Sequence, residues 1–230
     1  MNLKSFPWEE LEERLGVRIK NKKIFLEALT HKSYLHFHPY HLSRDNERLE
    51  FLGDALLEFF ISYYLFRKYA QLSEGELTLI RASLVNRDRL LLVAENLNLE
   101  KFMFFEKIQG AKGLKTVLAN GVEAIIGALF LSNGLLAVKK FVEKNFLTDL
   151  EIIINQKLYK DPKSRLQEII QEKYKLLPRY VVLKEEGKPH QKRFRVGIYL
   201  KQRLLSVAGG ESKQEAEIKA ALKALKKGNF

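Results

Sequence analysis

The stretch NERLEFLGDALLEFF, residues 46–60, combines acidic and large apolar side chains in a way that few folds accommodate. On a helix, at about 100° per residue, its acids fall on one stripe roughly 80° wide, and leucines and phenylalanines fill the other faces. The acids are Glu47, Glu50, Asp54 and Glu58. Because carboxylates are almost never fully buried without a partner, the stripe must face solvent, basic side chains or a bound cation.

A second helical segment carries an isolated acid. Within residues 116–138 the only charged residue is Glu123, and Asn120 lies one turn earlier on the same face. Glu50 and Asp54 are likewise one turn apart. Two facing helices with oxygen side chains at this spacing would form an all-oxygen site suited to Mg²⁺ or Mn²⁺.

Other interpretations of these patterns remain open at this stage. The acids could face solvent or pair with Arg48 and Arg81. A di-iron carboxylate bundle uses Glu-x-x-His pairs, and the sequence contains none. Residues 31–41, HKSYLHFHPYH, hold four histidines and offer an alternative transition-metal site, although their proline and irregular spacing indicate a loop. The GAKG stretch at 110–113 is interpreted as a basic turn.

The positive charge is concentrated at one end of the chain. The 230 residues carry a formal net charge of +12, and residues 157–230 hold 19 Lys and Arg against 8 Asp and Glu, a net charge of +11. Residues 1–156 hold 21 against 20. The two parts are electrostatically different, and the basic part suggests a polyanionic partner.

The absence of cysteine excludes disulfides, thiolate metal sites and thiol nucleophiles. The N-terminal residues MNLKSFPWEELEERLG lack the apolar core of a signal peptide. The longest run that is nearly free of charge, residues 116–138, contains the polar residues Asn120 and Glu123. Gly134 within it indicates the end of a helix, so the run is not interpreted as a membrane span. We therefore expect a cytoplasmic protein without a membrane partner.

The spacing of apolar residues along the sequence changes near residue 155. Up to about residue 150, apolar residues recur at three and four spacings in several stretches, which predicts helices. These stretches are WEELEERLG, KIFLEALTH, residues 46–60, EGELTLIRASLVNRDRLLLVAENLNL and residues 116–133. The polar segment QKLYKDPKS separates the two parts. Beyond it, the spacing of apolar residues predicts a helix over 163–174 and another over 212–227. Between these helices, apolar and polar residues alternate as in β-strands in three stretches, RYVVLKEEG, KRFRVGIYLKQ and RLLSVAGG. An α-β-β-β-α unit is predicted to close the chain.

Four motifs resemble those of ribonuclease III: THKSY, NERLEFLGDALLEFF, EGELTLIRASLV and VEAIIGALFL. The C-terminal unit resembles the double-stranded RNA-binding domain that follows the nuclease domain in bacterial members. The resemblance implies an all-α nuclease domain with the ribonuclease III endonuclease fold over residues 1–150, a linker over 151–160, and a small α+β RNA-binding domain over 161–230.

The resemblance also implies an activity. It is divalent-metal-dependent cleavage of double-stranded RNA by a homodimer, without a small-molecule substrate, to 5′-phosphate and 3′-hydroxyl ends, in the processing of ribosomal and messenger RNA precursors. The implied metal ligands are Glu50, Asp54, Asn120 and Glu123, with Mg²⁺ or its substitute Mn²⁺ as cofactor. Asp54, Glu123 and the supporting Glu47 are the implied catalytic residues.

Position 120 departs from the family pattern, because Asp usually stands where this chain has Asn120. An amide keeps an oxygen ligand but loses the charge. The alternative function is therefore a weakened or inactive enzyme that acts as a double-stranded RNA-binding protein.

The resemblance further implies which residues contact the duplex. A-form RNA is gripped across two minor grooves and the phosphates between them. The implied RNA-binding residues are Glu74, Gln167, Glu168, His190, Ser212, Lys213, Gln214 and Lys219.

Overall fold

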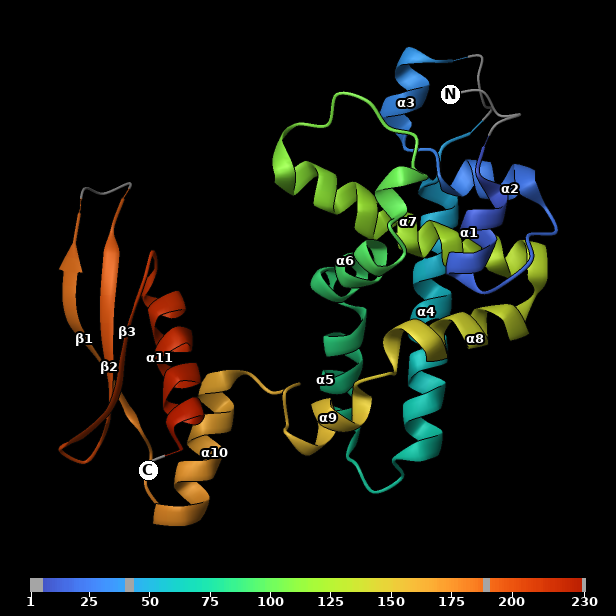
Figure 1. Ribbon diagram of the computed structural model, residues 1–230. Helices are drawn as coiled ribbons and strands as arrows, with labels where there is room; N and C mark the ends of the chain where they lie inside the picture. Colours follow the sequence, from blue (N-terminus) through green and yellow to red (C-terminus); the bar gives the residue numbers. More distant parts are fainter. Residues whose placement is uncertain (1–5, 40–43, 188–190, 229–230) are drawn as a thin grey trace. The chain divides into compact units, whose positions relative to one another are not determined.

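The computed structural model describes residues 6–39, 44–187 and 191–228, and the chain divides into two compact units, Met1–Ile154 and Asn155–Phe230 (Figure 1). The first unit is helical and the second is an α-β-β-β-α unit, which confirms the predicted fold class. The helices up to residue 155 are α1 (Trp8–Leu15), α2 (Lys22–Ala28), α3 (Lys32–Phe37), α4 (Glu47–Lys68), α5 (Glu74–Val85), α6 (Arg87–Asn96), η2 (Leu99–Lys101), α7 (Gly110–Asn133), α8 (Leu135–Phe146) and α9 (Leu150–Asn155).

Helices α4 and α7 form the centre of the first unit, and their backbones touch. A Cβ placed on Gly53 of α4 would lie 1.7 Å from the carbonyl oxygen of Glu123. A Cβ on Gly127 of α7 would lie 2.4 Å from the carbonyl oxygen of Leu49. Two glycines, one on each helix, therefore permit a separation that any other residue would prevent.

Helix α7 is the main core helix. By length and composition it is the one described helix that could cross a membrane, but 61% of its most apolar window is buried in the protein. It begins at Gly110, so the basic turn predicted for 110–113 is wrong: these residues form the first turn of α7. The first turn of a helix tolerates glycines such as Gly110 and Gly113 because its N–H groups have no intrahelical partners.

One predicted helical stretch is divided in two, and one further local prediction is wrong. The stretch that starts at Glu74 is helical as predicted but forms two helices, because Asn86 ends α5 and caps α6 by accepting a hydrogen bond from the Arg89 N–H at 2.9 Å. The segment 31–41, predicted as a loop, contains α3, whose N-cap is His31. In both places a short side-chain cap decided the local structure.

The first turn of α4 is anchored by the turn between α2 and α3. The N–H of Asn46 donates to the carbonyl of Thr30 at 2.9 Å, and Thr30 forms a parallel bridge with Phe104. The His31 N–H donates to the Phe104 carbonyl, also at 2.9 Å. These backbone bonds fix where the acidic stripe of α4 begins.

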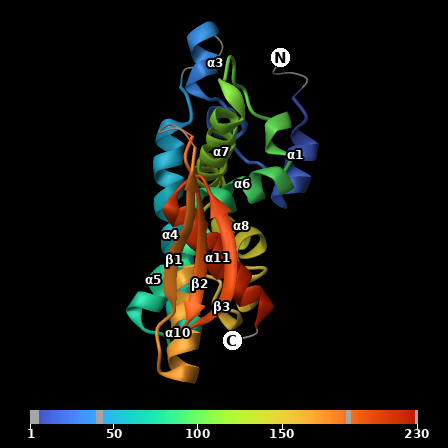
Figure 2. The ribbon, with the colours of Figure 1, turned by 90° about the vertical axis from the view of Figure 1, so that its left-hand side faces the viewer.

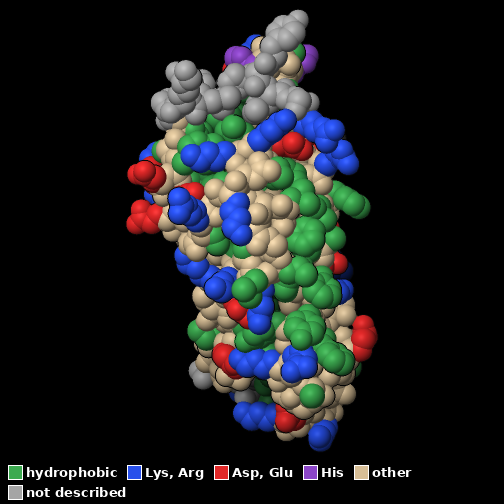
Figure 3. Space-filling view, turned by 90° about the vertical axis from the view of Figure 1, so that its right-hand side faces the viewer, with side chains coloured by type: hydrophobic (Ala, Val, Ile, Leu, Met, Phe, Trp, Pro, Cys, Tyr) green, Lys and Arg blue, Asp and Glu red, His purple; other side chains and the backbone are tan. Residues whose placement is uncertain are grey.

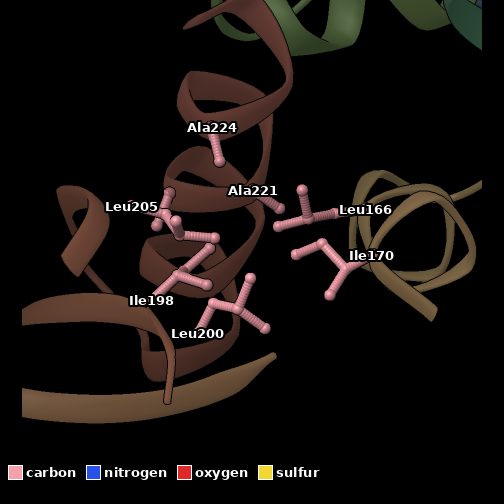
Figure 4. Packing of buried hydrophobic residues seen from close by; sticks show 8 residues of the cluster. Leu166, Ile170, Ile198, Leu200, Leu205, Ala221 and Ala224 are labelled. Atoms are coloured by element: carbon pink, nitrogen blue, oxygen red, sulfur yellow. The ribbon is translucent and has the colours of Figure 1, made fainter. Parts of the chain in front are cut away.

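The second unit is a three-stranded antiparallel sheet covered on one face by two helices (Figures 1 and 2). Its elements are α10 (Pro162–Tyr174), β1 (Arg179–Glu186), β2 (Arg193–Leu200), β3 (Arg203–Gly210) and α11 (Lys213–Lys227). Leu166 and Ile170 of α10 pack against Ile198 of β2 and Ala221 of α11 (Figure 4). This small apolar core holds the starts of α10 and α11 on one rigid body.

Replacing Gly53 with Ala tests the contact between α4 and α7. Overpacking costs about 1–3 kcal/mol, and here the new methyl meets backbone atoms that cannot rotate away. We expect a loss near 3 kcal/mol, or a fall of about 10 °C in the melting temperature of the helical unit. Gly75→Ala is the matched control, because nothing lies within 4 Å of its Cβ position. Equal melting temperatures for the two variants in a thermal scan would contradict the close contact.

Candidate active site

A pocket of about 620 Å³ lies where α4, α7 and the junction of α5 with α6 meet. It is lined by Glu47, Glu50, Phe51, Asp54, Val85, Arg87, Leu90, Ala119, Asn120 and Glu123. All the catalytic and metal-binding candidates from the sequence therefore line one pocket. Glu58, the fourth acid of the stripe, is exposed and lies outside this lining.

Glu123 is the most perturbed acid of the pocket. Burial raises the pKa of its carboxyl to about 7, and the charges of Asp54 and Glu50 act in the same direction. The guanidinium of Arg87 opposes this shift. At neutral pH the pocket thus holds more negative charge than its own basic groups compensate.

Glu50 and Asn120 contact each other across the two helices. Burial raises the pKa of the Glu50 carboxyl, and a hydrogen bond from the Asn120 side chain lowers it. An amide can donate this bond, whereas a carboxylate at position 120 would add a further negative charge beside Glu50. The side chain of Asn120 is therefore directed at the acidic cluster.

Glu47 lies at the rim of the pocket and is already paired. Its carboxylate accepts a hydrogen bond from Lys32 Nζ at 2.7 Å, and this contact lowers the pKa of Glu47. Both side chains are exposed, so the pair contributes little to stability. Its consequence is that Glu50, Asp54 and Glu123 carry the uncompensated charge.

The donor set fits a hard divalent cation. Carboxylate and amide oxygens are the ligands that Mg²⁺ and Mn²⁺ prefer. Burial and, to a smaller extent, the charges of Asp54 and Glu50 raise the pKa of Glu123, and a bound cation would oppose both effects. In the described part of the chain, no three His, Asp or Glu side chains are grouped closely enough to hold a metal ion as they stand. Ligation would therefore require the acidic side chains on α4 and α7 to move closer together.

The histidines of 31–41 have structural partners. His31 Nδ1 lies 2.8 Å from Ser33 Oγ, and His38 Nε2 lies 2.6 Å from Glu106 Oε1. Burial lowers the pKa of His31. His41 lies outside the described residues. Among the histidines that the structure describes, no transition-metal cluster forms.

The RNA-binding candidates of the second unit lie on two helix surfaces. Gln167 and Glu168 are exposed on α10, where Lys160 Nζ donates to both oxygens of Glu168 at 2.9 and 2.7 Å. His190 lies outside the described residues. The pairing with Lys160 neutralises Glu168, which would otherwise repel a phosphate.

The start of α11 presents the other candidates. Ser212 caps the helix by accepting a hydrogen bond from the Glu215 N–H at 3.1 Å, and Lys213 and Gln214 are exposed beside it. Lys219 forms an ion pair with Glu215 at 2.6 Å. Ser212 and Lys213 line a hollow together with residues at the end of β1 and the start of β2, among them Arg193 and the preceding Lys192.

Glu74 is separate from the pocket within one chain. It is the first residue of α5, and its carboxylate accepts a hydrogen bond from Thr78 Oγ1 at 3.0 Å. The pocket is reached by Val85 at the other end of α5. At 1.5 Å per residue the two ends are roughly 16 Å apart.

Two basic residues, one that lines the pocket and one that pairs with a pocket acid, were not predicted from the sequence. Lys32 pairs with Glu47, and Arg87 lines the pocket opposite Glu123. Asn86, a favoured N-cap residue, offered a signal, because a helix that starts there places Arg87 in its first turn. No local pattern indicated that Lys32 would meet Glu47.

Comparison with known proteins gives matches over almost the whole chain. Residues 21–150 match the Ribonuclease-III-like family and residues 162–227 match the double-stranded RNA binding motif. Ribonuclease 3 of Carboxydothermus hydrogenoformans is 44% identical over 94% of this chain and 93% of its own length. Ribonuclease 3 of Nitratiruptor sp. is 39% identical over 95% of both chains.

A solved structure agrees with these matches. The nuclease domain of ribonuclease III from Campylobacter jejuni, studied for structural flexibility in a region involved in dimer formation, is 40% identical. It covers 60% of this chain and 97% of its own, with a TM-score of 0.52. The chain therefore belongs to the ribonuclease III family, as an endoribonuclease that joins a helical nuclease domain to a double-stranded RNA-binding domain.

Proposed function

We propose that this endonuclease holds Mg²⁺, or Mn²⁺ as a substitute, between α4 and α7 and cleaves duplex RNA to 5′-phosphate and 3′-hydroxyl ends. The observation that carries the proposal is the convergence of Glu50, Asp54, Asn120 and Glu123 on one pocket, where burial and mutual repulsion raise the pKa of Glu123 to about 7. Such a perturbed acid in a concave site is a common sign of catalysis.

The residues of the pocket divide the work. The ion would be held by the carboxylates of Glu50, Asp54 and Glu123 and by the side-chain amide oxygen of Asn120. A bound divalent ion lowers the pKa of water and stabilises charge on a phosphoryl oxygen. Asp54 and Glu123 are the catalytic carboxylates, and Glu123 must lose its proton before it can bind a cation. Glu47 supports the site from the rim, where Lys32 fixes its orientation.

The C-terminal unit would position the duplex. Gln167 and Glu168 contact one minor groove, His190 contacts the next, and the remaining candidates contact phosphates with the amide groups at the start of α11. Those candidates are Ser212, Lys213, Gln214 and Lys219. The net charge of +11 over residues 157–230 supports this division of labour.

The cellular role follows from the family. We infer that the protein works in the cytoplasm on precursors of ribosomal and messenger RNA, without a membrane or small-molecule partner. Sequencing of precursor RNA in cells that lack the protein would identify these substrates.

An exposed apolar face on α4 and α5 supports a homodimer. Hydrophobic side chains gather on the surface of the helical unit (Figure 3). On α4, Phe51, Phe59 and Phe66 are 80%, 56% and 72% exposed, and Leu79 of α5 is 47% exposed. Since α4 residues spaced by seven or eight share a face, the three phenylalanines form one stripe. A second copy of this chain would bury the stripe. In such a dimer Glu74 would contact RNA beside the partner's pocket.

A specific contact favours a second candidate function, that of a weakened or inactive enzyme that binds duplex RNA. Asn120 supplies no charge to the pocket, and its side chain is engaged with Glu50. Both features reduce the attraction of the site for a divalent ion.

Glu123→Gln tests the proposed function. We expect the wild type to cleave long duplex RNA with Mg²⁺ and not with chelator, and the variant to lose cleavage by at least a hundredfold while binding RNA normally. The variant should fold, because Gln resembles the protonated form that a pKa of about 7 already makes accessible. A gel cleavage assay with a parallel binding assay measures both. Undiminished cleavage by the variant would remove Glu123 from the mechanism.

Phe66→Glu tests the dimer. A charge placed on the shared apolar face would face its symmetry mate, so we expect a dimeric wild type and a monomeric variant in light scattering at micromolar concentration. Leu204→Glu, an equally drastic change at a 47% exposed position on β3, serves as the control and should leave the mass unchanged. A wild-type monomer would refute the proposed interface.

Asn120→Asp separates the two candidate functions. Without metal, the new carboxylate beside Glu50 should lower the melting temperature, and Mg²⁺ should raise it more than in the wild type. The Mg²⁺ concentration for half-maximal cleavage should also fall, because the pocket gains one negative charge. Identical Mg²⁺ curves would mean that position 120 does not touch the metal. Cleavage by the Asp variant alone would make the natural chain a binding protein.

A further inference from the structure

Among the described residues that line the acidic pocket, Arg87 is the only one with a basic side chain. It is exposed, and in the described part of the chain it makes no ion pair within 4 Å and no side-chain hydrogen bond. An arginine kept as a counter-ion for Glu123 or Asp54 would contact one of those carboxylates. The guanidinium therefore faces the pocket with its donors unused.

The backbone that carries Arg87 is held in place by contacts of its neighbours. Asn86 caps the start of α6, and Leu90 is buried one turn later. Arg89 holds the same turn through two hydrogen bonds to the Asp149 carboxylate, at 2.8 and 2.6 Å, and one to the Phe146 carbonyl at 3.0 Å. A guanidinium that makes no ion pair or hydrogen bond to the described residues, on a backbone held in place, is suited to bind an anionic ligand.

The charges of the pocket indicate which anion this is. Glu50, Asp54 and Glu123 bring three negative charges, since Glu47 is paired with Lys32. One divalent cation alone would leave the ionised pocket with one negative charge facing a negatively charged phosphodiester. Arg87 removes that charge, and its planar donors match two phosphoryl oxygens.

We propose that Arg87 is a catalytic residue that binds a non-bridging oxygen of the phosphodiester at the cleavage site. The proposal rests on the proposed function of the same pocket, and it adds a contact between protein and substrate that does not pass through the metal.

Salt-dependent binding tests the contact without requiring cleavage. Full-length protein is titrated with duplex RNA in Ca²⁺, with gels to verify that the RNA stays intact. Arg87→Gln should weaken binding and reduce the slope of log affinity against log salt by about one, as Lys213→Gln should for a phosphate contact of the second unit. Arg18→Gln, which removes the same charge from an exposed site elsewhere, should leave the slope unchanged. A wild-type slope for Arg87→Gln would overturn the proposal.

Single-turnover cleavage at saturating Mg²⁺ tests the catalytic role. Arg87→Gln should slow cleavage by about tenfold to a hundredfold, the range for loss of a hydrogen bond between charged groups, and Arg87→Lys should restore part of the rate. An Arg87 that served only as counter-ion would give the opposite result. Its removal would lower the Mg²⁺ requirement and leave the saturated rate intact, and this outcome would also overturn the proposal.

The binding measurement and the cleavage measurement together separate this inference from the proposed function. If the wild type binds RNA but does not cleave it with Mg²⁺, the proposed function fails, and the slope of Arg87→Gln still decides whether Arg87 contacts phosphate.

Discussion

The contact between Gly53 and the backbone of α7 determines most of what the helical unit can do. With a hydrogen in place of a side chain at Gly53 and at Gly127, α4 and α7 approach until backbone atoms meet. This brings Glu50 and Asp54 opposite Asn120 and Glu123. A wider separation would place the four side chains on two unrelated surfaces, and the pocket would not exist. Glycine, usually a liability within a helix, is here the residue that creates the site.

The same contact imposes an electrostatic cost. Four carboxylates lie around one pocket, and one of them, Glu123, is half-buried with its pKa raised to about 7. The apolar packing of α7 must offset this repulsion, and its side chains from Val117 to Leu129 are mostly buried for that purpose. A stable core beneath an unstable cluster is typical of sites where function opposes stability.

Periodicity in the sequence predicted the order of elements, and the structure and the comparisons confirm the predicted fold class. It also placed Asp54 and Glu123 on faces that could meet. Periodicity did not predict features that depend on a capping residue or on contacts between distant segments. The apolar repeat pauses over the four polar residues 86–89 and then resumes, so the break between α5 and α6 was marked only by this short gap and its capping residue, Asn86. Lys32 meets Glu47, and Arg87 lines the pocket, through tertiary structure, which a helical repeat does not encode.

The unequal charge of the two units affects the kinetics of RNA capture. Residues 157–230 carry nearly all the net charge, so long-range attraction acts on the C-terminal unit first. Only residues 156–161 separate α9 from α10, and a connection this short gives an effective concentration on the order of millimolar for the second encounter. The nuclease pocket then needs little affinity of its own for a resting duplex. Its charges are free to favour the transition state over the bound substrate, which is the condition for fast turnover.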